Sequence, residues 1–414
     1  MRIFVIVSLL ITFLSQDCFC QKKWLNIYPD NISDLKNLEQ YSTIEELRIE
    51  HCDYVEISDN VEKLTSLKRL IISKCKEIQI SEKIKNTPIG SIYVTNVDLR
   101  KIPKWILECK QLTTLELSYC NLDEIDNELF NLTGIEFLDL SYNNIKAVSS
   151  LIRNLKNISS LSLENNYITS IPNEIGECKD LDYLSLSNNY LTSIPKEIDH
   201  LTNLKTLSLD NNQIKELALD FLKLINLKAL TFNNNFITEL PDTFNNNSML
   251  YYLSFKNNNI RTFPLSIYKL AKLEYFDASI NELEYIDEKI YGLEILEKLY
   301  LRGNKIKKVP GLIFQSEKMK YIDLSYNEIE SLPEVKNVNN SNIYFIDLSN
   351  NKLTDIPEFV YEMKKLVDLG FQNNNIQKVS SKIKNLKMLY TLGLSGNPLD
   401  VEVLQKKYPK IIIL

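Results

Sequence analysis

The feature that most constrains the fold of this chain is an apolar pattern that recurs about every 23 residues. In Leu181–Pro195, apolar side chains occupy relative positions 1, 4, 6, 11 and 14, Asn189 stands at position 9, and proline follows position 14. Neither a helical period nor simple strand alternation produces this spacing. The alternation at Leu184 and Leu186 predicts a short strand, and the asparagine pair after it predicts a turn. Because one such unit has too little apolar surface to fold alone, we expect neighbouring copies to cover it.

Copies of this unit follow one another from residue 44 to residue 399, with no linker between them. The step between copies is 23 residues, except for one step of 22 and one of 24. We therefore predict one array of about sixteen repeats, although 414 residues would otherwise suggest two or three domains. Position 4 of the repeats is filled by Leu47, Leu70, Ile92, Leu115, Leu138, Leu161, Leu184, Leu207, Leu230, Leu253, Phe276, Leu299, Ile322, Ile346, Leu369 and Leu392.

The repeated pattern LxxLxLxxNxLxxLPxxIxxLxx resembles the leucine-rich repeat family in its 23-residue variety, over residues 44–414. The resemblance implies an α/β fold, a horseshoe-shaped solenoid with a parallel sheet on the concave side and short-helical or irregular segments on the convex side. The alternation within each unit independently predicts a short strand that only the neighbouring copy can pair. Strands spaced about 4.8 Å apart would form a sheet about 75 Å long along its arc.

Residues 1–20 have the composition of a secretory signal peptide. Arg2 precedes an apolar run that ends at Leu14, and small side chains stand just before Gln21. The run is short for a membrane span, so an uncleaved anchor is the lesser alternative. Gln21 followed by two lysines resembles signal-peptide cleavage sites of Bacteroidetes-type bacteria. We expect a secreted, periplasmic or cell-surface protein with no stable membrane span after cleavage, and an intracellular scaffold only if the leader is retained.

Two further segments predict caps for the open ends of the repeat stack. Residues 21–43 carry apolar side chains at helical spacing from Ile32 to Leu38, which favours a helical N-terminal cap. Residues 400–414 predict a helix, then Pro409 and a final apolar strand, an ending that resembles the C-terminal caps of bacterial leucine-rich repeat proteins. Such caps are needed because a terminal repeat has no neighbour to cover its core face.

Position 9 of the unit predicts a structural ladder of buried amides. A buried asparagine has two donors and an acceptor, so stacked copies can satisfy turn backbone groups in adjacent repeats. The first four repeats have cysteine or valine there, which predicts a looser N-terminal third. The ladder residues are Asn143, Asn166, Asn189, Asn212, Asn235, Asn258, Asn281, Asn304, Asn327, Asn351, Asn374 and Asn397.

Positions 3, 5, 7 and 8 are expected to point from the sheet into the concave space, and aromatic and acidic residues gather there. Tyrosine is enriched at the energetic centres of interfaces, which favours a binding surface. The alternative is an aromatic ladder that stabilises the sheet by cross-strand contact, and the two roles are compatible. The candidate ligand-binding residues are Tyr183, Tyr252, Tyr275, Asp277, Tyr300, Arg302, Tyr321, Asp323, Phe345 and Asp347.

The charges among these candidates indicate the kind of partner. Asp323 and Asp347 are predicted one strand apart, where two carboxylates repel by about 1 kcal/mol in water. A basic partner, or neighbours such as Lys298 and Arg302, would relieve this repulsion. Calcium is the less favoured alternative, since a flat strand column rarely supplies six to eight oxygens. We predict a non-catalytic scaffold for a protein with a partly basic surface; the alternatives are a glycan or cell-surface ligand, and an inhibitor or virulence role.

Composition and motifs argue against other classes of function. The net charge of −6 gives no sign of nucleic-acid binding, which would need a basic face. With two histidines, nine glycines and no nucleophile motif, we expect no enzyme activity, cofactor or metal site. Five cysteines follow the predicted leader, and all fall at predicted core positions as free buried thiols. They are Cys52, Cys75, Cys109, Cys120 and Cys178.

Overall fold

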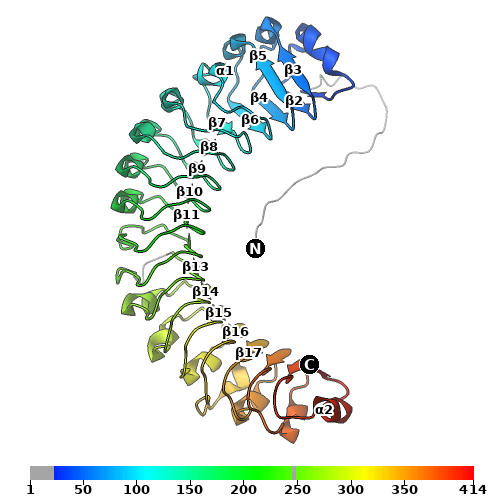
Figure 1. Cartoon of the computed structure of the whole chain (residues 1–414), viewed down its shortest axis with the longest axis vertical. Helices are drawn as coiled ribbons and strands as arrows, with labels where there is room; N and C mark the ends of the chain where they lie inside the picture. Colours follow the sequence, from blue (N-terminus) through cyan, green and yellow to red (C-terminus); the bar gives the residue numbers. More distant parts are fainter. Residues whose placement is uncertain (1–22, 245–248) are drawn as a thin grey trace.

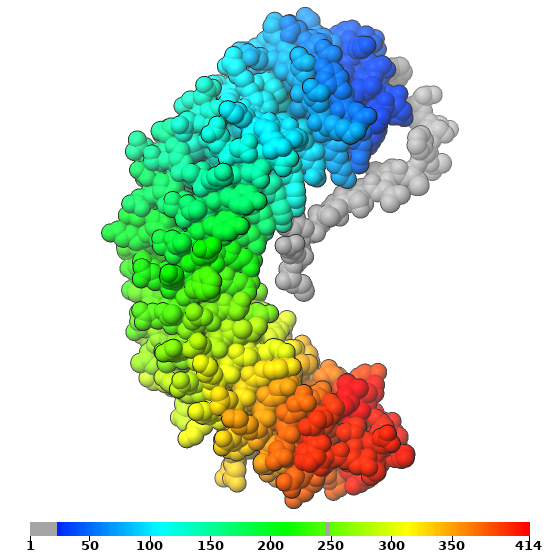
Figure 2. Space-filling view, in the orientation of Figure 1, coloured from blue at the N-terminus to red at the C-terminus, as the bar shows by residue number. Residues whose placement is uncertain are grey.

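The computed structural model describes residues 23–244 and 249–414, so the predicted signal peptide lies outside the described residues. Figure 1 shows a single curved solenoid with its strands along the inner side. Figure 2 shows the repeats stacked into one continuous arc. The predicted fold class, an open α/β solenoid with a parallel concave sheet, is confirmed.

The described part of the main sheet has eighteen strands, and each repeat pairs in parallel with the next. Position 4 residues lie directly opposite one another, as Leu184 lies between Leu161 and Leu207. The strands are β1 (Trp24–Ile27), β2 (Glu46–Glu50), β4 (Arg69–Ser73), β6 (Ser91–Thr95), β7 (Thr114–Glu116), β8 (Phe137–Asp139), β9 (Ser160–Ser162), β10 (Tyr183–Ser185), β11 (Thr206–Ser208), β12 (Ala229–Thr231), β13 (Tyr252–Ser254), β14 (Tyr275–Asp277), β15 (Lys298–Tyr300), β16 (Tyr321–Asp323), β17 (Phe345–Asp347), β18 (Asp368–Gly370), β19 (Thr391–Gly393) and β20 (Ile412–Ile413).

The N-terminal repeats differ from the rest. Strands β2, β4 and β6 have five residues, whereas β7 to β19 have three. A second parallel sheet joins β3 (Tyr54–Ile57) to β5 (Glu77–Ile80), and Figure 1 shows it outward of the main sheet. The sequence did not lead us to expect this sheet. The backbone hydrogen bonds of this second sheet offset part of the hydrogen bonding that ladder asparagines would supply between repeats. The looser N-terminal third stays a prediction.

The convex side consists mostly of short 3₁₀ helices, one in most repeats. Their apolar residues, such as Ile198 and Ile290, point into the core. The helices are η1 (Ile32–Tyr41), η2 (Asp59–Lys63), η3 (Glu82–Asn86), α1 (Lys104–Leu107), η4 (Asn127–Asn131), η5 (Ser150–Asn154), η6 (Asn173–Glu177), η7 (Lys196–His200), η8 (Leu265–Lys269), η9 (Glu288–Gly292), η10 (Gly311–Phe314), η11 (Val338–Asn340), η12 (Glu358–Glu362), η13 (Ser381–Asn385) and α2 (Val401–Lys407).

Both ends of the solenoid combine a helix with a strand. At the N-terminus β1 pairs with β2, and η1, which is interrupted at Asn37, lies between them in the chain. The predicted cap was a helix alone, so the strand β1 is an addition to it. At the C-terminus α2 is followed by β20, which pairs with β19. No helix in the described ranges is long and apolar enough to cross a membrane.

The core runs the length of the arc between the sheet and the convex helices. All five cysteines predicted to lie in the core are buried and free, as expected. Burial raises the pKa of the Cys109 and Cys120 thiols to about 12, because the thiolate would lose its hydration. These thiols are therefore packing groups at neutral pH.

Candidate concave binding surface

The turn after each strand fixes the rim of the concave surface. In a representative repeat the Asn189 amide donates to the carbonyls of Leu163, Leu186 and Ser187 at 2.9–3.2 Å, and its oxygen accepts from the Ile168 N–H at 3.0 Å. Each amide thus joins two adjacent repeats. The same pattern of donation and acceptance recurs along the column through Asn374.

The residue just before the ladder position has a left-handed backbone in every repeat, with a φ between 52° and 73°. Asparagine tolerates this conformation, and it fills the position in Asn165, Asn188 and their counterparts. Ile280 is the exception that stands out, since a β-branched residue at a φ of 54° is strained. Its side chain is 43% exposed, so burial does not compensate the strain.

Five candidate residues form one continuous line of rings on β13 to β17. Tyr252 stacks on Tyr275 with ring centroids 4.3 Å apart, and Tyr321 stacks on Phe345 at 4.0 Å. Tyr300 joins the two pairs, lying 5.2 Å from Tyr275 and 4.7 Å from Tyr321. We call these five residues the aromatic ladder. The strands β13 to β17 that carry it lie along the inner side of the arc in Figure 1.

Tyr300 reaches the ladder from a different position in its repeat. Position 3 of this repeat is Lys298, which lies between Tyr275 and Tyr321 in the strand register. Tyr300 is at position 5, directly opposite Asp277 and Asp323. Diagonal neighbours across paired strands are within reach of an aromatic side chain, so the Tyr300 ring closes the gap that Lys298 leaves.

The three candidate aspartates share a bond that the sequence did not lead us to expect. The Oδ1 atom of each accepts the backbone N–H of the serine two residues later, at 2.9 Å for Asp277 and Ser279 and 2.8 Å for Asp347 and Ser349. In Asp323 the same oxygen also accepts from the serine hydroxyl. One carboxylate oxygen of each therefore shapes its own turn. Asp277 is buried, whereas Asp323 and Asp347 are partly exposed.

Burial disfavours the ionised form of the Asp323 carboxyl. Burial is the largest cause that raises the pKa of this carboxyl, and the neighbouring Asp347 raises it further. Arg302 lowers it, but more weakly. The reason is geometric, since Arg302 lies 4.0 Å over the Tyr326 ring and donates to the Ser325 hydroxyl at 2.9 Å.

The remaining candidate lies apart from this cluster. Tyr183 is at position 3 of β10, and Thr206 and Ala229 follow it in the same column before Tyr252. The structure therefore brings together nine of the ten candidates and leaves Tyr183 several strands away. Burial raises the pKa of Tyr183, as it does for the ladder tyrosines.

Two exposed residues beside the ladder were not among the candidates. Ile280 and Tyr326 are 43% and 49% exposed, and they stand at the left-handed position that Asn257 fills in a neighbouring repeat. A signal was present in the sequence, because both break a run of asparagines at that position.

Comparison with known proteins decides the family. A family model described as a leucine-rich repeat region matches residues 172–280, and one described as leucine rich repeat matches residues 110–168 and 294–353. A leucine-rich repeat protein of Leptospira interrogans is 27% identical over 94% of this chain and 99% of that one, with a TM-score of 0.84. This chain is a leucine-rich repeat protein.

Other leucine-rich repeat proteins share the fold at lower identity. The functional domain of InlJ from Listeria monocytogenes is 20% identical over 86% of this chain and 74% of that one, with a TM-score of 0.71. The receptor kinase HAESA of Arabidopsis thaliana is 20% identical over 91% of this chain and 70% of that one, with a TM-score of 0.69. No curated protein matches the sequence significantly.

Proposed function

We propose that this leucine-rich repeat protein is a non-catalytic scaffold that binds a partner protein through the aromatic ladder and the aspartates beside it. The observation that carries the proposal is the unbroken line of five rings on β13 to β17. All five residues are half buried, so part of each ring stays accessible to a partner. Tyrosine clusters of this kind supply much of the energy of protein interfaces.

The acidic groups give the proposed surface its charge preference. Asp277, Asp323 and Asp347 follow the same side of the ladder, each with one oxygen held by a backbone N–H. A lysine or arginine from a partner would pair with the partly exposed carboxylates of Asp323 and Asp347 and remove the repulsion between them. The partner surface that fits is therefore convex, partly apolar and partly basic.

Related folds support a binding role. HAESA is described in complex with the peptide hormone IDA and the co-receptor SERK1. Proteins built on this fold typically present a scaffold surface and carry no catalytic centre. We extend that role to this chain, and we further propose that the protein is exported, as the composition of residues 1–20 suggests.

Comparative capture tests the proposal. Partners are captured from extracts of the source cells by chemical cross-linking to three proteins. These are the parent chain, the ladder variant Tyr275→Ala/Tyr321→Ala, and a control on the convex side, Tyr285→Ala/Tyr291→Ala. Tyr285 and Tyr291 are 52% and 67% exposed, so their loss should leave the fold intact. We expect the ladder variant alone to lose its partner, with cross-links that map to β13 to β17. Equal capture by all three proteins contradicts the proposal.

A second candidate, glycan binding, rests on a different edge of the solenoid. Tyr167 and Tyr190 stack with centroids 5.8 Å apart, and both are nearly half exposed. They line a shallow pocket of about 510 Å³ with the amides of Asn165, Asn188 and Gln213. Exposed tyrosine faces beside amides suit sugar rings. A glycan array separates the two candidates, because Tyr167→Ala/Tyr190→Ala should abolish sugar binding and spare the protein partner.

A further inference from the structure

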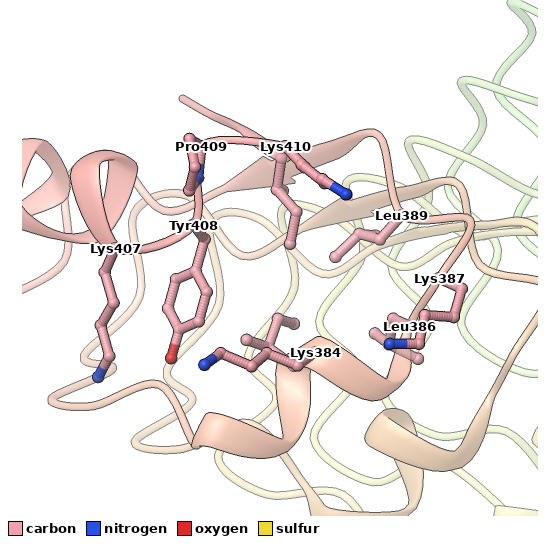
Figure 3. Close-up of a pocket in the computed structure, with 10 residues that line it drawn as sticks. Lys384, Leu386, Lys387, Leu389, Lys407, Tyr408, Pro409 and Lys410 are labelled. Carbon is pink, nitrogen blue, oxygen red and sulfur yellow. The ribbon is translucent and has the colours of Figure 1, made fainter.

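A cleft of about 390 Å³ lies at the C-terminal end of the solenoid, and none of its lining residues belongs to the aromatic ladder. It separates η13 and the turn after it from the segment that links α2 to β20 (Figure 3). Its floor is apolar, and Ile383, Leu386 and Leu389 form it from one side while Pro409 and Ile411 close it from the other. The volume suits a small molecule with an apolar body.

The rim of the cleft is strongly basic. Among its lining residues, all of them within the described chain, none is acidic. The neighbouring Lys382 is paired with Glu358, whereas the rim lysines form no ion pair with a carboxylate of the described residues. Two of these lysines come from η13 and the turn after it and two from the C-terminal cap, and they are Lys384, Lys387, Lys407 and Lys410.

A buried hydroxyl points into the same place. Tyr408 is 4% exposed, and its hydroxyl oxygen finds no hydrogen-bond partner within the described residues. In Figure 3 this hydroxyl lies between the ammonium ends of Lys384 and Lys407. A buried polar group without a partner costs stability and calls for an explanation. Exposed lysines alone would be an ordinary solvated surface, but they do not account for this hydroxyl.

We propose that this cleft binds a small anion, a carboxylate or phosphate carried on an apolar body. The anionic oxygens accept from the Tyr408 hydroxyl and from the ammonium groups of Lys384 and Lys407, while the apolar body covers Leu386 and Ile411. Lysine side chains have four rotatable bonds, so Lys384 can turn aside and open access to the hydroxyl. An anion suits this arrangement of donors, because hydrogen bonds to a charged acceptor are stronger than those to a neutral one.

Isothermal titration calorimetry on the full chain tests the site with three probes: phenyl phosphate, benzoate and inorganic phosphate. We expect saturable binding of phenyl phosphate or benzoate, and weaker binding of inorganic phosphate because it lacks the apolar body. Preference between the first two probes identifies the anion. Absence of saturable binding for all three at millimolar concentration overturns the proposal.

Variants locate the binding in this cleft. Tyr408→Phe should weaken the preferred probe about ten-fold, and Lys384→Ala/Lys407→Ala at least as much, through loss of charge-assisted hydrogen bonds. Lys382→Ala, outside the cleft, should have no effect. Without a probe, Tyr408→Phe should melt at the same temperature as the parent or higher, because it removes an unpartnered hydroxyl. Unchanged affinity in the lysine pair overturns the proposal even if Tyr408→Phe fails to fold.

Discussion

Asp323 lies directly opposite Asp347 in the paired strands β16 and β17. Both carboxylates are held in place by the serine two residues further along, so neither can turn away without losing its bond to the turn. Arg302, the nearest arginine that the sequence suggested as a neutralising group, is engaged with Tyr326 instead. The solenoid therefore keeps two carboxylates side by side, next to the half-buried rings of the aromatic ladder.

Replacing Asp323 by asparagine should stabilise the protein and weaken its binding. Asparagine keeps an oxygen for the Ser325 N–H and removes a repulsion of about 1 kcal/mol. Burial raises the pKa of Asp323 in the folded protein. The stability that the protonated carboxyl contributes is therefore complete below the pKa of Asp323 in the unfolded chain, and it is lost as the pH rises through the pKa in the folded protein. Urea unfolding at pH 7 should show the gain, which should shrink towards pH 4. A variant less stable than the parent at pH 7 would argue against this view of the site.

The amide ladder should be intolerant of apolar replacement. Asn258 bonds the Phe232 and Phe255 carbonyls and the Ile237 N–H. Leucine would leave these groups buried and unpaired, so Asn258→Leu should lower the free energy of unfolding by about 3 kcal/mol or more. Asn259→Ala, at an exposed position next to it, is the control and should change little. Equal effects of the two changes would show that the ladder bonds are not the cause.

The buried thiols should be unreactive in the folded protein. Burial raises the pKa of Cys109 and Cys120 to about 12, so little thiolate exists at pH 8. Ellman's reagent should label these two residues only after unfolding. A raised pKa also means that their contribution to stability is full below the unfolded pKa near 9 and is lost as pH rises towards 12. Fast labelling of the native protein at Cys109 or Cys120 would contradict the packing described above.

Ile280 offers a test of stored strain. Its left-handed backbone costs a β-branched residue about 1–2 kcal/mol, a cost that asparagine largely avoids. Ile280→Asn should therefore raise the midpoint of urea unfolding, and the reciprocal Asn257→Ile should lower it. If Ile280→Asn also weakens partner binding, the strain is retained for contact with the partner. A lower midpoint for Ile280→Asn would show that its packing outweighs the strain.

Much of this architecture could be predicted from the sequence because each repeat restates the same local rule. The spacing of Leu184, Leu186 and Asn189 predicted short parallel strands followed by a turn, and the fold class is confirmed. The second sheet of β3 and β5 was missed although both strands alternate polar and apolar residues, because they stand where the repeat pattern predicts irregular or short-helical segments. Pairing across 23 residues is a property of the stack and not of one repeat.

The sequence predicted which residues face the concave space, but it did not predict which of them contact one another. That Tyr275 and Tyr321 face the concave space follows from their place in the repeat. The diagonal reach of Tyr300 across Lys298 does not, since it depends on which rings stand on both neighbouring strands. The unpartnered hydroxyl of Tyr408 was equally beyond the sequence, because it arises where the cap folds back onto the last repeat.

The affinity of the captured partner for the ladder variant tests the central claim most directly. The dissociation constant is measured by surface plasmon resonance for the parent, Tyr275→Ala/Tyr321→Ala and Tyr285→Ala/Tyr291→Ala, after circular dichroism shows that all three are folded. Interface tyrosines that act as hot spots contribute about 2 kcal/mol each, so the ladder variant should bind about a hundred-fold or more weakly. The convex control should match the parent. A folded ladder variant that binds within about two-fold of the parent, well under 1 kcal/mol, would contradict the claim.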